Sequence, residues 1–281
     1  MTNSNSYLQN RVIIVTGAAS GFGRLVCEKS AAKGARVLCA DVNETGVKET
    51  VAAITELGGT AEAIVTDVRA LDDTQAMAAK ALELWGQIDI LVNNAGIMPL
   101  AFFADHQSAI DAWTRCIDIN IKGVMHGIVS VHDQMIAQGQ GHIVNLSSIY
   151  SNNPVAGAAV YGASKAAVNF LSDALRVESQ GRIKVTNVKP TGVPGTALGG
   201  SVINPDALIG ILGQNGPAYL QQMAAYAAGD LPPEQSDADN IEYLALEPEY
   251  LADQIIYAID QPWGVTIAEV TVRAAGEGYV L

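Results

Sequence analysis

The sequence predicts an α/β protein of the doubly wound class, in which helices cover both faces of one parallel sheet. Three observations support this prediction. Short apolar runs alternate with helical patterns of ten or more residues along the front half of the chain, as in βαβ units. Runs such as VIIV at 12–15 and HIVNL at 142–146 are nearly continuous in apolar residues, which is typical of strands buried on both faces. A glycine-rich turn joins the first expected strand to the first expected helix.

The elements of the front half follow from these patterns in order. The expected strands lie at 12–16, 36–41, 61–67, 88–96 (running into a turn), 141–148 and 182–190. The expected helices are one ending near Gly34, then 45–57, 72–85, a long stretch to about Ala137, and 160–179. Ligands of such sheets bind beyond the carboxyl ends of the strands, so we expect a site at that edge.

After Pro190 the pattern loosens. Short helices are expected at 206–212 and 218–228, a polar loop at 229–240, a helix at 248–259 and a closing strand at 265–274. We interpret the whole chain, 1–281, as a single domain in which 193–247 forms a helical substrate lid over the ligand-binding edge. The alternative is that the stripe Tyr219, Met223 and Tyr226 only packs on the core or on a neighbouring subunit.

Composition excludes several classes of partner. Apolar residues make up 49% of the chain and the net charge is −13, which argues against nucleic acid or an anionic membrane surface as partner. We find no signal peptide at the polar N-terminus and no apolar run near the roughly 20 residues of a membrane helix. The three cysteines are widely spaced and predict a reduced, cytoplasmic protein. The four histidines lack metal-ligand spacing, so no metal site is expected.

The distribution of charge bears on the substrate. Residues 190–272 contain no Lys or Arg but eleven Asp and Glu, seven of them between Asp230 and Glu249. The expected lid therefore has no cation of its own to bind a carboxylate or phosphate. An uncharged, largely apolar substrate fits this composition best.

The turn TGAASGFG at 16–23 has the features of a phosphate-binding loop. Gly17, Gly21 and Gly23 permit a tight turn and a close approach of ligand to backbone, and the helix that follows offers unpaired N–H groups to a pyrophosphate. Ser20 and Phe22 belong to the same turn. The glycine spacing is GxxxGxG. The assignment as a phosphate-binding loop therefore depends on the expected strand before the turn and the expected helix after it.

Asp41 ends the second expected strand, eighteen residues beyond Gly23. A carboxylate there would accept hydrogen bonds from the adenosine ribose and repel a 2′-phosphate. No Arg or Lys stands at Ala19, Ser20 or Val42 to neutralise that phosphate, so NAD is favoured over NADP. The alternative reading of Asp41 is a helix-capping residue.

With these residues identified, the chain resembles the short-chain dehydrogenase/reductase family over nearly its full length. The resemblance implies a Rossmann-like dinucleotide fold, NAD(P)-linked alcohol or ketone chemistry, and a homodimer or homotetramer. The matching residues are TGAASGFG at 16–23, Asp41, Asp67, Val68, NNAG at 93–96, Asn120 in DINIKG, Ser148, and YGASK at 161–165. The loop PTGVPGT at 190–196 departs from the family's usual Pro-Gly pair.

Tyr161 and Lys165 are four residues apart on an expected helix, so their side chains share one face. A free phenol with a pKa of about 10 is a poor base at neutral pH. A neighbouring ammonium lowers such a pKa by about one to three units. We therefore expect Tyr161 to act as general acid or base.

The resemblance implies the remaining roles. Ser148 would hold and polarise the substrate oxygen, Lys165 would also bind the nicotinamide ribose, and Asn120 would hold a water in a proton relay. Asp67 and Val68 would flank the adenine, and Asn93 would support its turn while its backbone faces the cofactor. The other cofactor contacts implied are Ala95, Gly96 and Val193.

The resulting hypothesis is an NAD-dependent enzyme that interconverts a secondary alcohol and a ketone. A cyclic diol or hydroxysteroid dehydrogenase is the alternative among enzymes. The alternative that is not an enzyme is a dinucleotide-sensing protein without turnover. Such a sensor would not need Ser148, Tyr161 and Lys165 together.

Overall fold

The computed structural model describes residues 6–194 and 196–280, and in it the expected strands form one sheet. Every pair of neighbouring strands is parallel, and the order is β3-β2-β1-β4-β5-β6-β7. The strands are β1 (Val12–Thr16), β2 (Arg36–Asp41), β3 (Thr60–Val65), β4 (Ile90–Asn93), β5 (Gly141–Leu146), β6 (Ile183–Pro190) and β7 (Glu269–Val272). The doubly wound α/β prediction is confirmed.

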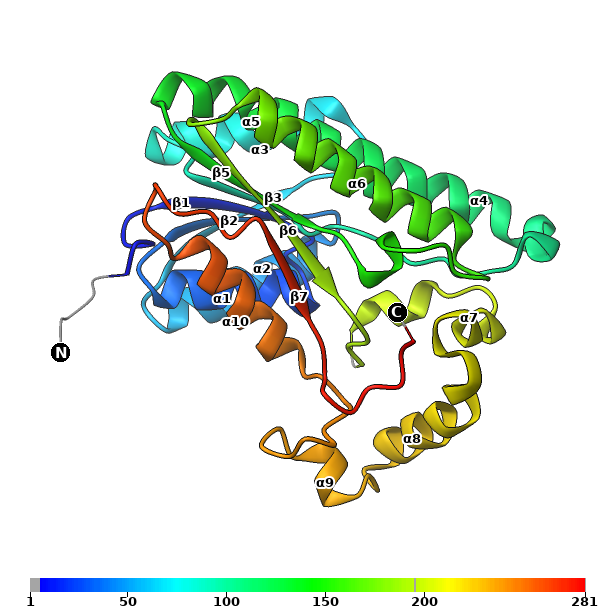
Figure 1. Cartoon of the computed structure of the whole chain (residues 1–281). Coiled ribbons are helices and arrows are strands. Elements are labelled where there is room, and N and C mark those ends of the chain that lie inside the picture. The colour runs from blue at the N-terminus through cyan, green and yellow to red at the C-terminus, as the bar shows by residue number, and fades with distance from the viewer. Residues whose placement is uncertain (1–5, 195, 281) are drawn as a thin grey trace.

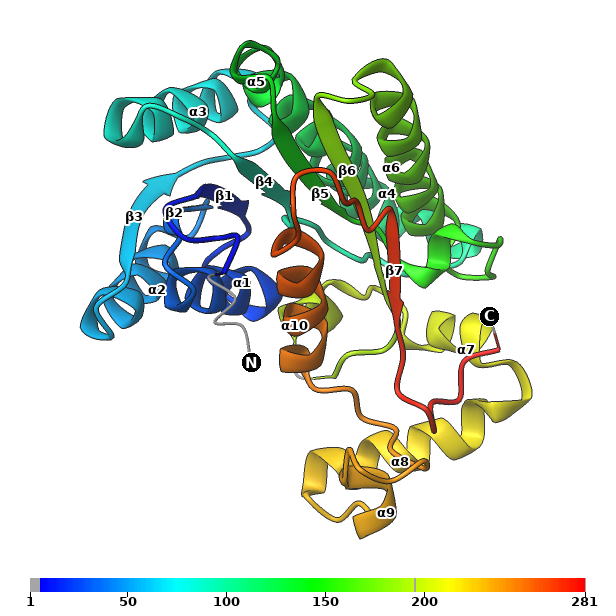
Figure 2. The ribbon, with the colours of Figure 1, turned by 60° about the vertical axis from the view of Figure 1, so that its left-hand side comes forward.

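Helices cover both faces of the sheet (Figure 1, Figure 2). One layer holds α1 (Gly21–Ala32), α2 (Glu44–Glu56) and α10 (Pro248–Ile259), with α1 packed between the other two. The opposite layer holds α3 (Leu71–Trp85), α4 (His106–Ile117), α5 (Gly123–Gln138) and α6 (Ala159–Glu178). Residues 12–16 of β1, 90–93 of β4 and 141–146 of β5 are buried throughout, as strands covered on both faces should be.

The strand order reverses next to β1, which pairs with β2 on one side and with β4 on the other. The connections from β1 and from β4 therefore leave toward opposite faces. A crevice forms at such a switch point beyond the carboxyl ends of the strands.

The long helix expected up to Ala137 is interrupted in the structure. A π-helical turn, Asp118–Lys122, separates α4 from α5. A π-helical turn places one extra residue in the helix and is frequent at functional sites. Hydrophobic periodicity does not reveal it because the apolar face continues on both sides.

The segment after β6 forms short helices below the carboxyl edge of the sheet: α7 (Ile209–Leu212), α8 (Gly216–Ala228) and α9 (Pro233–Ser236) (Figure 1). The polar loop expected at 229–240 thus contains one helical turn. The closing strand is shorter than expected because only 269–272 pair with β6, and the chain then runs back to α7.

Candidate active site

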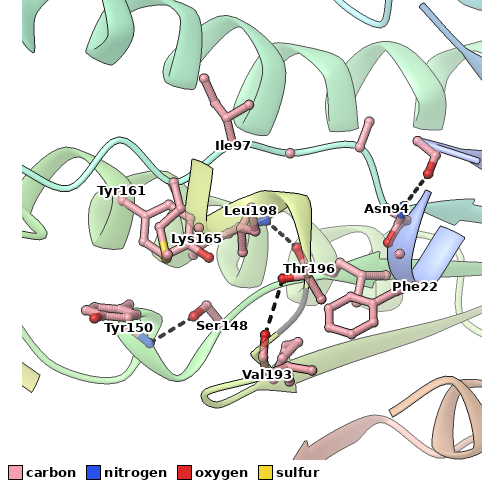
Figure 3. Close-up of a pocket in the computed structure, with 18 of the residues that line it drawn as sticks. Phe22, Asn94, Ile97, Ser148, Tyr150, Tyr161, Lys165, Val193, Thr196 and Leu198 are labelled. Atoms are coloured by element: carbon pink, nitrogen blue, oxygen red, sulfur yellow. Dashed lines mark hydrogen bonds between the residues drawn. The ribbon is translucent and has the colours of Figure 1, made fainter. Parts of the chain in front are cut away.

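A cavity of about 680 Å³ lies at the carboxyl edge of the sheet. Residues at or just past the ends of six strands line it: Gly17, Asp41, Thr66, Asn94, Ser148 and Pro190. The cavity therefore spans the switch point, where the parallel topology predicts a ligand. Figure 3 shows Tyr161, Lys165, Ser148 and Tyr150 gathered toward one end, and Phe22 and Asn94 toward the other.

The glycine-rich turn forms one wall of the cavity through Gly17, Ser20, Gly21 and Phe22. Gly17 has a φ of +68°, and a Cβ there would lie 2.7 Å from the Asn94 side chain. Ser20 precedes α1, but its side chain does not cap the helix. The first N–H groups of α1 can therefore donate hydrogen bonds to a ligand.

Gly23 has a different task from the other two glycines. It does not line the cavity, and a Cβ there would lie 2.1 Å from the carbonyl oxygen of Gly17. Gly23 therefore lets the start of α1 pack against the end of β1, as the third glycine of such a turn is expected to do.

Asp41 lines the cavity and also organises the turn. Its Oδ2 accepts from the backbone N–H of Ala19 at 3.0 Å, and its Oδ1 accepts from the N–H of Asn43 at 2.9 Å. Asn43, rather than Asp41, is the side chain that caps α2. The carboxylate thus faces the cavity with its position fixed from both sides.

Asp67 and Val68 also line the cavity, and next to them lies Arg69, a cation that sequence reasoning missed. The Arg69 guanidinium binds both oxygens of Asp67, with Nε at 2.9 Å from each. This hydrogen bonding lowers the pKa of the Asp67 carboxyl. Because the two side chains are paired, Asp67 and Arg69 together carry no net charge.

Tyr161 lies on α6 with its side chain facing the cavity, and the residue is only 3% exposed. Burial raises the pKa of Tyr161 above its ordinary value, and the Ser148 hydroxyl acts against that rise. The direction differs from the lowering we expected from Lys165, because burial in a dry site disfavours a phenolate. Tyr161 is therefore a buried, neutral phenol in this structure.

Lys165 lies one turn further along α6 and is also buried. Its Nζ donates to the carbonyl oxygen of Leu146 at 2.7 Å and lies 5.9 Å from the centre of the Tyr161 ring. Burial lowers the pKa of Lys165 to about 8, so the amine is mostly protonated at neutral pH. No other hydrogen-bond acceptor contacts this Nζ among the described residues, so two of its donors remain for a ligand.

Asn120 lies in the π-helical turn, is fully buried and does not line the cavity. Its Oδ1 accepts from the N–H of Ile97 at 3.0 Å, and its Nδ2 donates to the carbonyl oxygen of Ile97 at 2.9 Å. A Cβ on Gly96 would lie 3.3 Å from this Oδ1 and 3.5 Å from the Nζ of Lys165. The amide thus fixes the chain at 96–97 beside Lys165.

The NNAG turn contributes Asn94, Ala95 and Gly96 to the cavity, but not Asn93. Asn93 is buried at the end of β4, where its Nδ2 donates to Oδ1 of Asn145 on β5 at 2.8 Å. Asn94, which sequence reasoning did not single out, donates to the carbonyl oxygens of Thr16 and Gly17. We predicted Asn93 as the contact and this is wrong for its side chain, because two adjacent amides in a sequence do not show which of them faces the cavity.

The wall opposite the sheet is apolar and comes from the segment after β6. Val193 lines the cavity, as expected, together with Leu198, Leu208, Tyr219, Leu220 and Met223. Tyr219 and Met223 of the predicted stripe thus face the cavity, whereas Tyr226 is 38% exposed and does not. Tyr279, near the chain's end, completes this wall and was also missed from sequence.

Comparison with known proteins identifies the class. A family model described as short chain dehydrogenase matches residues 11–205, and the chain belongs to that family of NAD(P)-binding oxidoreductases. An uncharacterized oxidoreductase of Listeria monocytogenes is 34% identical over 265 residues, covering 94% of this chain and 96% of the relative.

Two solved structures show the same fold and differ in the cofactor they hold. A short-chain dehydrogenase/reductase of Burkholderia phymatum, in complex with NAD, is 27% identical, with a TM-score of 0.74 and coverage of 94% of this chain and 89% of that one. The closed form of a serine dehydrogenase complexed with NADP+ is also 27% identical, with a TM-score of 0.77 and coverage of 96% and 97%. The family relation therefore does not choose between the two dinucleotides.

Proposed function

We propose that this protein is an NAD-dependent oxidoreductase that interconverts a secondary alcohol and a ketone. The observation that carries the proposal is the grouping of Ser148, Tyr161 and Lys165 at one end of a cavity whose other end has the glycine-rich turn. A sensor without turnover would need only the dinucleotide end.

The residues present fit a dinucleotide. A side chain at Gly17 would fill the turn that a pyrophosphate approaches, and the free N–H groups at the start of α1 lie beside it. Asp67 and Val68 would flank the adenine, and Ala95, Gly96, Lys165 and Val193 would hold the nicotinamide half. When bound, the cofactor supplies or accepts the hydride.

NAD is the proposed form because Asp41 lines the cavity beside the glycine-rich turn, where the adenosine ribose would lie. A 2′-phosphate there would meet a carboxylate, and like charges at close range repel. The nearby cation, Arg69, is already bound to Asp67. Steady-state kinetics with NAD and NADP test this choice, and a preference for NADP would refute the role given to Asp41.

Tyr161 is the proposed acid and base. As a buried neutral phenol it donates its proton to the oxygen of a ketone under reduction, while the Ser148 hydroxyl holds that oxygen. In the oxidation of an alcohol Tyr161 must first lose its proton, and the ammonium of Lys165 stabilises the resulting charge. Asn120 is proposed to position Lys165 and the water relay beside it.

We propose that 193–247 serves as the substrate lid within a single domain. Its apolar residues at the cavity wall support an uncharged substrate, and the cavity-lining residues of this segment include no Lys or Arg. A cyclic diol or hydroxysteroid is the second substrate class that such a pocket admits.

The protein is also proposed to be a cytoplasmic homo-oligomer. Cys27, Cys39 and Cys116 are free thiols, in keeping with a reducing compartment. No helix in the described part of the chain is long and apolar enough to cross a membrane. On α6, Phe170 and Val177 are 78% and 75% exposed and lie seven residues apart, so we propose that this side of the helix contacts another subunit. Light scattering of the purified protein tests the assembly.

The function is tested with secondary alcohols and the matching ketones, by following absorbance of the reduced cofactor in both directions. We expect turnover of cyclic and aliphatic uncharged compounds with NAD or NADH. Cofactor binding without turnover of any alcohol or ketone would favour the sensor instead.

A further inference from the structure

Two tyrosines of the apolar wall form a polar pair that the proposed chemistry does not use. Tyr219 lies on α8 and Tyr279 in the tail after β7, and their hydroxyl oxygens are 3.0 Å apart. Both residues line the cavity, and their rings lie 5.6 Å apart. The pair belongs to an apolar cluster that includes Leu208, Ile211 and Leu212, and Glu277 is a charged side chain near it.

The pair has hydrogen-bonding capacity to spare. Each hydroxyl has one hydrogen, so only one of the two is used between them, and the other hydrogen has no acceptor among the described residues. A polar group in an apolar wall is costly unless it finds a partner. The partner available in the cavity is a ligand or a water.

The pair is held in place by the chain around it. The tail is fixed to the lid on both sides of Tyr279, where Asn215 donates to the carbonyl oxygen of Gly278 at 2.8 Å and Val280 donates to that of Ile211 at 3.0 Å. A Cβ on Gly192 would lie 2.1 Å from the Tyr279 hydroxyl. The Tyr279 hydroxyl therefore fits only because residue 192 is a glycine. With the tail fixed in this way, the pair is preorganised for binding.

Tyr150 connects the pair to the reaction centre. Its ring lies 5.5 Å from the ring of Tyr161 in an edge-to-face arrangement. Its pKa is raised by burial first and then by the neighbouring Tyr161 and Tyr219, so it lies within the electrostatic reach of both. The cavity thus has the proposed reacting end at Tyr161 and a second polar group at Tyr219 and Tyr279, and Tyr150 neighbours both.

The chemistry of the Tyr219–Tyr279 pair favours an uncharged oxygen atom of a ligand as its partner. Burial raises the pKa values of Tyr219 and Tyr279, and the neighbouring Glu277 raises both further. Both phenols are therefore neutral at physiological pH, and the nearby Glu277 carboxylate is paired with Arg273 at 2.6 Å, so the two hydroxyls offer a ligand hydrogen bonds and no charge. A hydroxyl or a carbonyl group satisfies the pair without placing a charge there.

We propose that the Tyr219–Tyr279 pair binds a second oxygen of the substrate, a hydroxyl or carbonyl that an apolar skeleton separates from the carbon that reacts at Tyr161. This inference rests on the proposed redox function and narrows its substrate class to diols, hydroxyketones and diketones. A simple alcohol of the same skeleton leaves the pair without a partner and is a poorer substrate.

The test compares skeletons that differ only in the second oxygen. The probes are cyclohexanol with the 1,2-, 1,3- and 1,4-cyclohexanediols, and 1-decalol with 1,5-decalindiol. We expect one diol to exceed its mono-alcohol in kcat/KM by tenfold or more. Tyr219→Phe and Tyr279→Phe should each reduce this ratio to near one, whereas Tyr226→Phe, on the outer side of α8, should leave it unchanged.

Binding gives a readout that does not depend on turnover. In the Tyr161→Phe background saturated with NAD, calorimetry compares each diol and mono-alcohol with and without Tyr219→Phe or Tyr279→Phe. A diol preference that needs both tyrosines supports the inference even if no probe is turned over, in which case the redox proposal alone fails. No diol preference, or a preference that survives both substitutions, overturns the inference. Variants that lose only stability would show the pair to be a tether between tail and lid, which also overturns it.

Discussion

Replacing Lys165 by Met should make the protein more stable and inactive at the same time. Lys165 is 5% exposed, and burial lowers its pKa from 10.5 to about 8. Each unit of pKa shift corresponds to about 1.36 kcal/mol, so the buried ammonium costs the folded state about 3 kcal/mol at pH 7. Loss of the hydrogen bond to the carbonyl oxygen of Leu146 removes about 1 kcal/mol. The net expectation is a gain of about 2 kcal/mol.

The pH dependence of this gain has a definite sign. Between pH 8 and 10.5 the unfolded chain binds a proton at Lys165 that the folded protein does not, so stability of the wild type rises with pH in this window. The penalty is complete below pH 8 and has largely disappeared above 10.5. The advantage of Lys165→Met should therefore shrink to near zero at about pH 10.

Urea unfolding at pH 7 and pH 10, at one protein concentration, measures both quantities. Lys48→Met is the matched control, because Lys48 is exposed on α2 and its replacement should change the free energy of unfolding by less than about 0.5 kcal/mol. A Lys165→Met protein that is less stable at pH 7, or equally stabilised at both pH values, would refute this reasoning.

Two further predictions concern the cofactor. Asp41→Asn should raise kcat/KM with NADP relative to NAD by about tenfold, because it removes the charge that repels a 2′-phosphate while keeping a hydrogen-bond acceptor; an unchanged ratio in steady-state kinetics would contradict it. Gly17→Ala should weaken NADH binding, measured by fluorescence titration, by tenfold or more, because its φ is +68° and a Cβ would meet Asn94. Gly58→Ala is its control, with a φ of +80° and open space around the Cβ, and should lower stability without changing NADH affinity.

The alternation of strands and helices was sufficient to predict the layers, the parallel sheet and the edge where the cavity lies. Local patterns carry this information because a strand covered on both faces must be apolar throughout. The π-helical turn at 118–122 was not predictable, because its extra residue keeps the apolar face of the flanking helices. The same holds for α9, a single turn within a polar loop.

In the candidate site too, residues in local sequence patterns were predictable, and residues brought together only by the tertiary fold were not. Most of the predicted residues line the cavity, because the glycine turn, the NNAG turn and the Tyr161–Lys165 spacing are local patterns. Tyr279 could not be found in this way, since only the return of the tail from β7 to α7 brings it beside Tyr219. The pKa direction of Tyr161 was wrong because i, i+4 spacing shows which charge is near but not how completely the pair is buried.

The proposed function depends most on one step, the exchange of a proton between the Tyr161 hydroxyl and the substrate oxygen. The most direct measurement is the rate of hydride transfer by Tyr161→Phe in a single turnover, together with its affinity for NADH. We expect wild-type affinity for NADH and a rate lower by at least about a thousandfold. A variant that binds NADH normally and transfers hydride at the wild-type rate would contradict it.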